Sequence, residues 1–301
     1  MVIFLQTDSS QINIVSIITQ TITNIISNIF SSIDNNLYNL LDDLIFINSD
    51  IITDSSFIKI IGNNSSGIIL ICNAILFSIC LYYSFSLLLS YLTYAQVQKP
   101  TQFIFRLLLC TIALNFSFFI CEKLIYLTSC VSLAIRNVGE HVFDTEICFS
   151  TLIQNLNSSL YIEGASLNLF SFDGLIKTII SVGLISLILS YSLRYIMIKV
   201  FVLISPFAFI SLVVKNFAWI FKSWLKIFLS LLFLQILVPL ILLVGFSLNI
   251  SDNTTFSRLT IIGVIYALIK ANSYMKEFMG GISTDISFSL SNMKNLFKTG
   301  G

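Results

Sequence analysis

Residues 67–94, GIILICNAILFSICLYYSFSLLLSYLTY, decide the fold class, because no charged residue occurs between Lys59 and Lys99. About 20 consecutive apolar residues in a helix cross the hydrocarbon core of a bilayer. The stretch therefore predicts a membrane-spanning helix, and the other long apolar stretches of the chain need to be interpreted in the same way.

The composition also indicates a membrane protein. Of the 301 residues, 56% are hydrophobic and 10% are charged, and the mean hydropathy is +0.93. Soluble domains carry about 25% charged residues, so a soluble globule of this composition would expose large apolar patches to water. The net charge of +1 gives no reason to expect nucleic-acid binding by bulk electrostatics.

Four further apolar stretches predict additional crossings. They lie at about 103–121, with an apolar extension to Ile135, at about 175–197, at 227–248 and at about 254–271. The last stretch is the weakest, because Arg258 and Lys270 intrude, although both side chains can snorkel toward opposite interfaces. We expect an all-α, polytopic membrane helix bundle with about five transmembrane helices.

Residues 200–214 are apolar but short. As a helix they would extend about 22 Å, less than a full crossing, and Pro206 lies in their first half. Basic residues flank the segment on both sides, and such flanks favour a segment that enters and leaves on the same side. We expect a re-entrant or broken hairpin here; an ordinary short span is the alternative.

The distribution of cations predicts the orientation. If the loop with Lys99 and Arg106 is cytoplasmic, most Lys and Arg residues fall on that side and most carboxylates fall outside. This arrangement places the N-terminus outside and the C-terminus inside. The cytoplasmic cations around the short segment form what we call the basic belt: Arg194, Lys199, Lys215, Lys222 and Lys226.

The chain divides into three regions. Residues 1–66 form an extracytoplasmic, amphipathic N-terminal arm, residues 67–274 form the transmembrane domain with an extracytoplasmic loop at 136–173, and residues 275–301 form a cytoplasmic tail. The helical part of the arm is acidic and lacks Lys and Arg, so we expect it to dock on a partner helix or on a second copy. The alternative is that it packs over its own membrane domain.

The sequence offers little catalytic chemistry. It contains no GxSxG, GxxxxGK[ST] or GxGxxG pattern, and its single histidine excludes HExxH. His141 lies beside Glu140 and Asp144, but we favour a solvated acidic loop over a metal site. The six cysteines form no CxxC pair and are interpreted as small buried side chains. We expect a non-enzymatic protein without cofactor or metal.

Residues 194–248, RYIMIKVFVLISPFAFISLVVKNFAWIFKSWLKIFLSLLFLQILVPLILLVGFSL, carry a more specific pattern. An apolar segment with Ser205-Pro206 is followed by a short loop at 215–223, by Trp224-Leu225 and by the long apolar span. This order resembles the TrbL/VirB-six family, the polytopic inner-membrane subunit of type IV secretion and conjugation machines. Trp219 and Trp224 flank Lys222 and are expected to anchor the chain at the membrane interface.

The resemblance implies a multi-pass channel or platform subunit in the bacterial inner membrane. Such a subunit would form homo-oligomers among membrane lipids and would work with other secretion-system subunits, including a separate ATPase, while DNA or protein passes. The basic belt could steer a polyanion or bind anionic lipid headgroups, at about 1 kcal/mol per cation. The rival hypotheses are a pore-forming membrane scaffold and a stand-alone transporter or permease, which would predict inverted repeats with paired broken helices.

Overall fold

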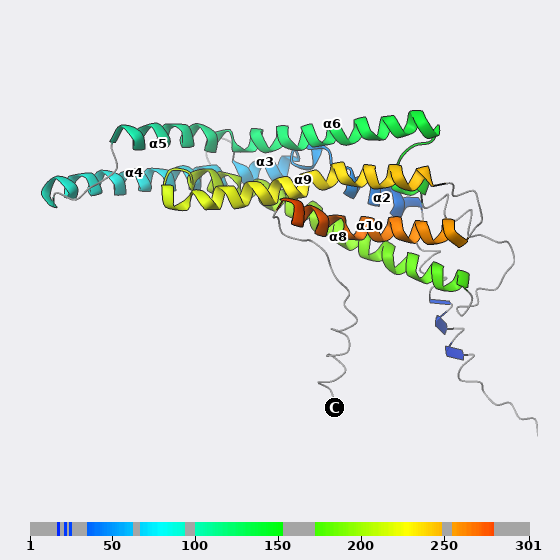
Figure 1. The fold of residues 1–301 in the computed structure, drawn as a ribbon. Helices are drawn as coiled ribbons and strands as arrows, with labels where there is room; N and C mark the ends of the chain where they lie inside the picture. The colour runs from blue at the N-terminus through cyan, green and yellow to red at the C-terminus, as the bar shows by residue number, and fades with distance from the viewer. Residues whose placement is uncertain are drawn as a thin grey trace, which may run out of the picture.

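The structure, a computed structural model, describes residues 17–18, 21–22, 24–25, 35–62, 67–93, 100–152, 172–248 and 255–279. Within these ranges every regular element is helical (Figure 1). The predictions for most of the first 34 residues, for residues 153–171 of the outside loop and for the tail from residue 280 onward lie outside the described residues.

Four helices are long and apolar enough to cross a membrane. They are α4 (Ile68–Thr93), α6 (Ser117–Phe143), the Val182–Ile210 part of α8 (Phe172–Ile210) and α9 (Ala218–Ser247). Two other helices complete the bundle: α5 (Pro100–Asn115), which is shorter and apolar, and α10 (Thr255–Met279). The protein is a multi-pass, all-helical membrane protein, which confirms this part of the prediction.

Residues 200–210 continue α8, so the expected re-entrant or broken hairpin is not a separate element. Pro206 lies inside the helix, where its missing N–H leaves the carbonyl oxygen of Val202 without the usual donor. The hydroxyl of Ser205 donates to that oxygen at 2.7 Å, which compensates for the loss. The chain then turns through residues 211–214 and the 3-10 helix η2 (Lys215–Phe217) and returns as α9.

The end of α6 also differs from the sequence prediction. The helix extends to Phe143, so residues 136–143 are helical and do not belong to a loop. Asp144 ends the helix in a left-handed conformation with φ 51°. Asp is one of the few residues besides glycine that adopt this conformation at a helix end without large strain.

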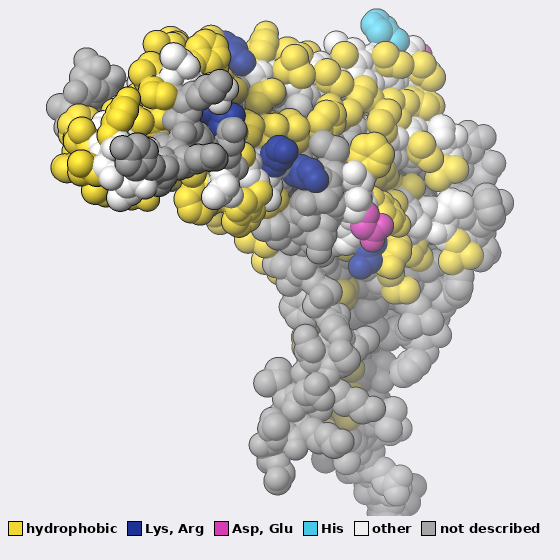
Figure 2. Space-filling view, turned by 60° about the vertical axis from the view of Figure 1, so that its left-hand side comes forward, with side chains coloured by type: hydrophobic (Ala, Val, Ile, Leu, Met, Phe, Trp, Pro, Cys, Tyr) yellow, Lys and Arg dark blue, Asp and Glu magenta, His cyan; other side chains and the backbone are white. Residues whose placement is uncertain are grey.

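Helices α8 and α9 form the centre of the bundle. Half of the residues in their apolar windows are buried, compared with 22% for α6 and 11% for α4. Figure 1 shows α4 and α5 extending beyond one end of the α8–α9 hairpin, while α6 and α10 pack toward the other end. Hydrophobic side chains cover much of the outer surface (Figure 2), so lipid or other protein must cover it.

The N-terminal segment packs inside this bundle. Helix α2 (Asn35–Ile45) contacts α8, the 3-10 helix η1 (Ser49–Ile51) contacts α6, and α3 (Ser55–Ile61) contacts α4. Four of its apolar side chains are almost completely buried: Leu41, Ile45, Ile47 and Ile52. For residues 35–61, packing on the chain's own membrane domain is therefore the correct alternative, and no free arm exists there.

Candidate functional site

The residues that carry the family resemblance meet between α8 and α9. Trp224 is only 4% exposed, and its indole Nε1 donates to the carbonyl oxygen of Phe201 at 3.0 Å. Its ring stacks on Phe228 with centroids 5.3 Å apart. Phe201 lies one turn before Ser205 and Pro206, both buried. Trp224 therefore packs α9 against the part of α8 where Pro206 removes a backbone hydrogen bond. We call this contact the Trp224 joint.

The two tryptophans have different roles. Trp224 is buried, so the expectation that it anchors the chain at the membrane interface is wrong. Trp219 is 63% exposed at the start of α9, which is compatible with that role. Leu225 is partly buried against the same hydrophobic cluster as Trp224.

The basic belt is divided in the structure. Lys222 and Lys226 are exposed on the first turns of α9, and Lys215 begins η2 just before them. Lys199 is partly buried, with its Nζ 5.1 Å from the ring centroid of Tyr195 and 5.7 Å from that of Phe57. Arg194 is completely buried, so it does not belong to an exposed belt.

Arg194 instead holds the N-terminal segment from inside the bundle. Its Nη1 donates to the carbonyl oxygen of Ile45 at 3.0 Å, and its Nε donates to that of Leu231 at 2.9 Å. Ile45 is the last residue of α2, and the carbonyl groups at a helix C-terminus carry partial negative charge and lack intrahelical donors. A side-chain cation on α8 thus caps α2 at this end. One turn after Leu231, the amide nitrogen of Gln235 donates to the carbonyl oxygen of Ile47.

Three buried polar groups lie at about this level along the bundle. The Nη2 of Arg194, the Oε1 of Gln235 and the hydroxyl of Ser132 on α6 make no hydrogen bond within the part of the chain that the structure describes. A Cβ on Gly139 would lie 3.4 Å from the side chain of Leu243, so these two residues are level. Helices α6 and α9 run parallel (Figure 1), and Ser132 and Gln235 each lie about two turns before Gly139 and Leu243. Ser132 is therefore level with Gln235. We call Ser132, Arg194 and Gln235 the buried polar layer.

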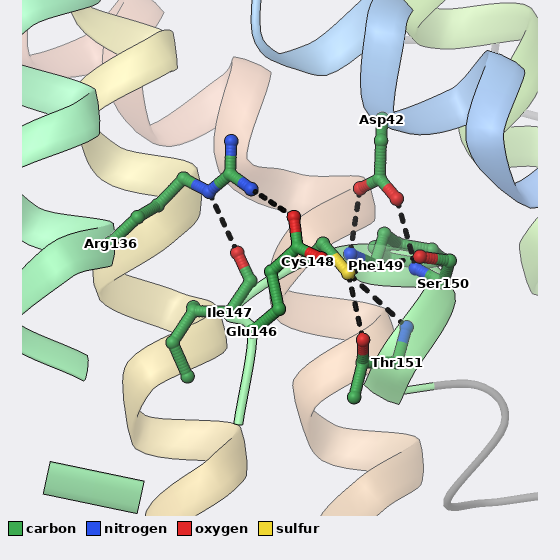
Figure 3. Close-up of polar contacts among 8 residues, drawn as sticks. All are labelled: Asp42, Arg136, Glu146, Ile147, Cys148, Phe149, Ser150 and Thr151. Carbon is green, nitrogen blue, oxygen red and sulfur yellow. Dashed lines mark hydrogen bonds and ion pairs between the residues drawn. The ribbon is translucent and has the colours of Figure 1, made fainter. Parts of the chain in front are cut away.

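Asp42 forms a second attachment of α2 (Figure 3). Its two carboxylate oxygens accept the backbone N–H groups of Phe149 and Ser150, at 2.7 and 3.1 Å. These N–H groups open the helical turn at 149–152, so a carboxylate from another helix caps its positive end. Burial raises the pKa of Asp42, and this effect outweighs the hydrogen bonds from Phe149 and Ser150 and the nearby Arg136, which lower it.

Arg136 completes this clamp. Its Nε donates to the carbonyl oxygen of Ile147 at 2.8 Å, and its Nη2 lies 3.1 Å from the carboxylate of Glu146. Its guanidinium also lies over the ring of Phe46, 4.4 Å from the centroid. The end of α6, the turn after it and the N-terminal segment are therefore held together. Cys148, in the turn after α6, is buried.

The possible metal site is not assembled. Within the described ranges, no three His, Cys, Asp or Glu side chains gather closely enough to hold a metal ion. His141 and Asp144 are exposed.

The roles of Arg194 and Asp42 as attachment points were not predicted from the sequence. A charge in the middle of the stretch 175–214 is the signal that could have revealed Arg194, if that stretch had been interpreted as one helix. Nothing near Asp42 indicates its partners, which lie more than one hundred residues away.

Comparisons with protein-family models, with curated protein sequences and with solved structures find no match to this chain.

Proposed function

We propose that this protein is a non-enzymatic subunit of a membrane secretion channel, of the kind formed by the TrbL/VirB-six family in the bacterial inner membrane. The observation that supports the proposal is the Trp224 joint. Ser205, Pro206 and Trp224, the residues on which the resemblance rests, belong to one packed unit that shapes the α8–α9 hairpin. Because these three residues contribute to one packing arrangement, their joint occurrence in the sequence has a structural reason.

The proposed topology has five crossings, with the N-terminus outside and the C-terminus inside. In this topology α4, the α5–α6 pair, α8, α9 and α10 cross in alternating directions. The α8–α9 turn is then cytoplasmic, with Lys222 and Lys226 beside it. A helix of 39 residues such as α8 extends about 58 Å, well beyond a hydrocarbon core of about 30 Å, so part of α8 lies outside the core.

The exposed apolar faces suit a protein that works in an assembly. Only 11% of the apolar window of α4 is buried within the chain, and large side chains such as Phe77, Phe85 and Leu92 are exposed along it. We propose that lipids, further copies of the chain and other secretion-system subunits cover these faces. A separate ATPase would supply the energy, and DNA or protein would be the passing substrate.

Gene deletion and complementation in the host test this proposal. The readout is transfer of DNA or protein to recipient cells, with membrane abundance of the subunit measured in parallel. We expect deletion to abolish transfer, Trp224→Leu to reduce it strongly, and the matched control Trp219→Leu to restore it. Transfer that continues at the wild-type level in the deletion strain would refute the proposal. Uptake of a small solute by the purified protein alone would favour the permease.

A further inference from the structure

We propose that residues 45–52 are a releasable plug, which closes a hydrated, anion-preferring path through the bundle at the buried polar layer. This inference goes beyond the proposed secretion function and does not depend on it. It rests on how the segment is held and on what its departure would uncover.

The plug is held in two ways. At the polar layer its contacts are made by main-chain oxygens, since Ile45 and Ile47 offer carbonyl groups to Arg194 and Gln235. Around them, the side chains of Ile47 and Ile52 are buried among apolar residues of the bundle. The segment therefore seals the layer with apolar side chains while its backbone satisfies the polar groups only in part.

The closed state carries a cost that release would remove. Arg194 is completely buried, and none of the ion pairs among the described residues involves it. Its hydrogen bonds among the described residues go to two backbone oxygens, and one of its nitrogens has no acceptor there. A buried charge with incomplete partners is strongly disfavoured relative to a hydrated one. Water admitted by release would hydrate Arg194, Gln235 and Ser132 together.

The same three side chains would line the opened path. Ser132, Arg194 and Gln235 come from α6, α8 and α9, three helices that contact one another, and each carries a buried polar atom without a hydrogen bond among the described residues. A hydrated guanidinium in a low-dielectric surrounding attracts anions and repels cations. An opened path would therefore pass chloride in preference to potassium, and this preference would depend on Arg194.

The plug also has an attachment that can regulate its release. Three residues before it, Asp42 on α2 caps the helical turn at 149–152, and Phe46, within the plug, lies under Arg136. Both contacts lie toward the end of the bundle where α6 ends. A partner that disturbs the turn at 144–150 would loosen α2, and through α2 the plug.

The test uses the full chain reconstituted into liposomes of neutral phospholipid, with chloride and potassium flux measured separately. The variant Ile47→Asn with Ile52→Asn makes the plug polar and should open the path, because water then competes for the segment. The matched control is Ile60→Asn, which makes the same change at a side chain that is 51% exposed in α3. We expect chloride flux to rise at least tenfold in the plug variant and to stay at the wild-type level in the control.

Two further measurements decide the interpretation. Adding Arg194→Met to the plug variant should abolish the preference for chloride over potassium, which a purely structural role of Arg194 would not affect. A cysteine at Ser132, with the native cysteines replaced, should react with a small water-soluble thiol reagent only in the plug variant. A folded plug variant without increased flux overturns the proposal. So does a plug variant that cannot fold, because the segment would then be a permanent part of the bundle.

Discussion

Replacing Trp224 is the sharpest perturbation of the α8–α9 hairpin. The indole is buried, donates a hydrogen bond of 3.0 Å to Phe201 and stacks on Phe228 at 5.3 Å. The hydrogen bond contributes about 1 kcal/mol and the aromatic contact about 0.5–1.5 kcal/mol. Loss of side-chain volume in a packed site adds about 1 kcal/mol. Trp224→Leu should therefore lower the free energy of unfolding by about 2–4 kcal/mol.

Trp224→Phe separates these contributions. Phenylalanine keeps an aromatic ring against Phe228 but cannot donate to Phe201, so its cost should be about 1–2 kcal/mol. The matched control is Trp219→Leu, at a side chain that is 63% exposed, and it should change stability by less than about 0.5 kcal/mol.

Thermal unfolding in detergent micelles, followed by loss of helical circular dichroism, measures these differences. For a chain of this size about 2 °C corresponds to 1 kcal/mol, so Trp224→Leu should lower Tm by roughly 4–8 °C. Intrinsic fluorescence adds a second readout, because Trp219→Phe leaves only the buried indole to report. Equal Tm shifts for Trp219→Leu and Trp224→Leu would refute the reasoning, because burial would then not distinguish the two sites.

Three other predictions concern separate parts of the bundle. Arg194→Met should leave Tm nearly unchanged, because the loss of two hydrogen bonds is offset by the removal of a buried charge. It should nevertheless raise the rate of amide hydrogen exchange in residues 45–52 about tenfold, which corresponds to about 1.4 kcal/mol of local stability. Gly139→Ala should lower Tm, because the added Cβ would lie 2.5 Å from the side chain of Ile147. Gly263→Ala should raise Tm, because its Cβ would have nothing within 4 Å and alanine stabilises a helix by up to about 1 kcal/mol relative to glycine. Asp42→Asn should remove a pH dependence of the free energy of unfolding. The pKa of Asp42 is raised, so the folded state holds this proton more tightly than the unfolded state does. The contribution of Asp42 to stability is therefore fully present below pH 3.8 and falls as the pH rises to the raised pKa.

Each of these predictions has an outcome that contradicts it. Unchanged exchange in residues 45–52 of Arg194→Met would mean that the arginine does not hold the plug. Parallel Tm shifts in the two glycine variants would contradict the close packing at Gly139. The free energy of unfolding of the wild type relative to Asp42→Asn should fall between pH 3.8 and the raised pKa. A difference that rises or stays constant over this range would contradict the burial argument for Asp42.

The spans could be predicted because hydropathy is a local property. The stretches at 67–94 and 227–248 became α4 and most of α9, since an uninterrupted apolar run in lipid has to form a helix to satisfy its backbone. The boundary at Lys199 was wrong because a charge in a sequence does not show what it contacts. Arg194 donates two hydrogen bonds to backbone oxygens and Lys199 lies over two aromatic rings, so one helix can carry both.

The functional residues were harder to predict, for two physical reasons. Trp219 and Trp224 are five residues apart, which turns their side chains about 140° from one another on a helix, so both could not face the same surroundings. The sequence did not reveal which one would be buried, because that depends on the position of α8. The contact of Asp42 with Phe149 depends on how α2 threads along the bundle, and no local pattern encodes such a path.

Cysteine labelling in intact cells tests the proposed membrane topology most directly. Single cysteines replace Lys222, exposed beside the α8–α9 turn, and His141, exposed near the opposite end of the bundle on α6, in a background without native cysteines. An impermeant thiol reagent added outside should label the His141→Cys variant at once and the Lys222→Cys variant only after the membrane is permeabilised. Labelling of both variants from outside, or of Lys222→Cys alone, would contradict the account.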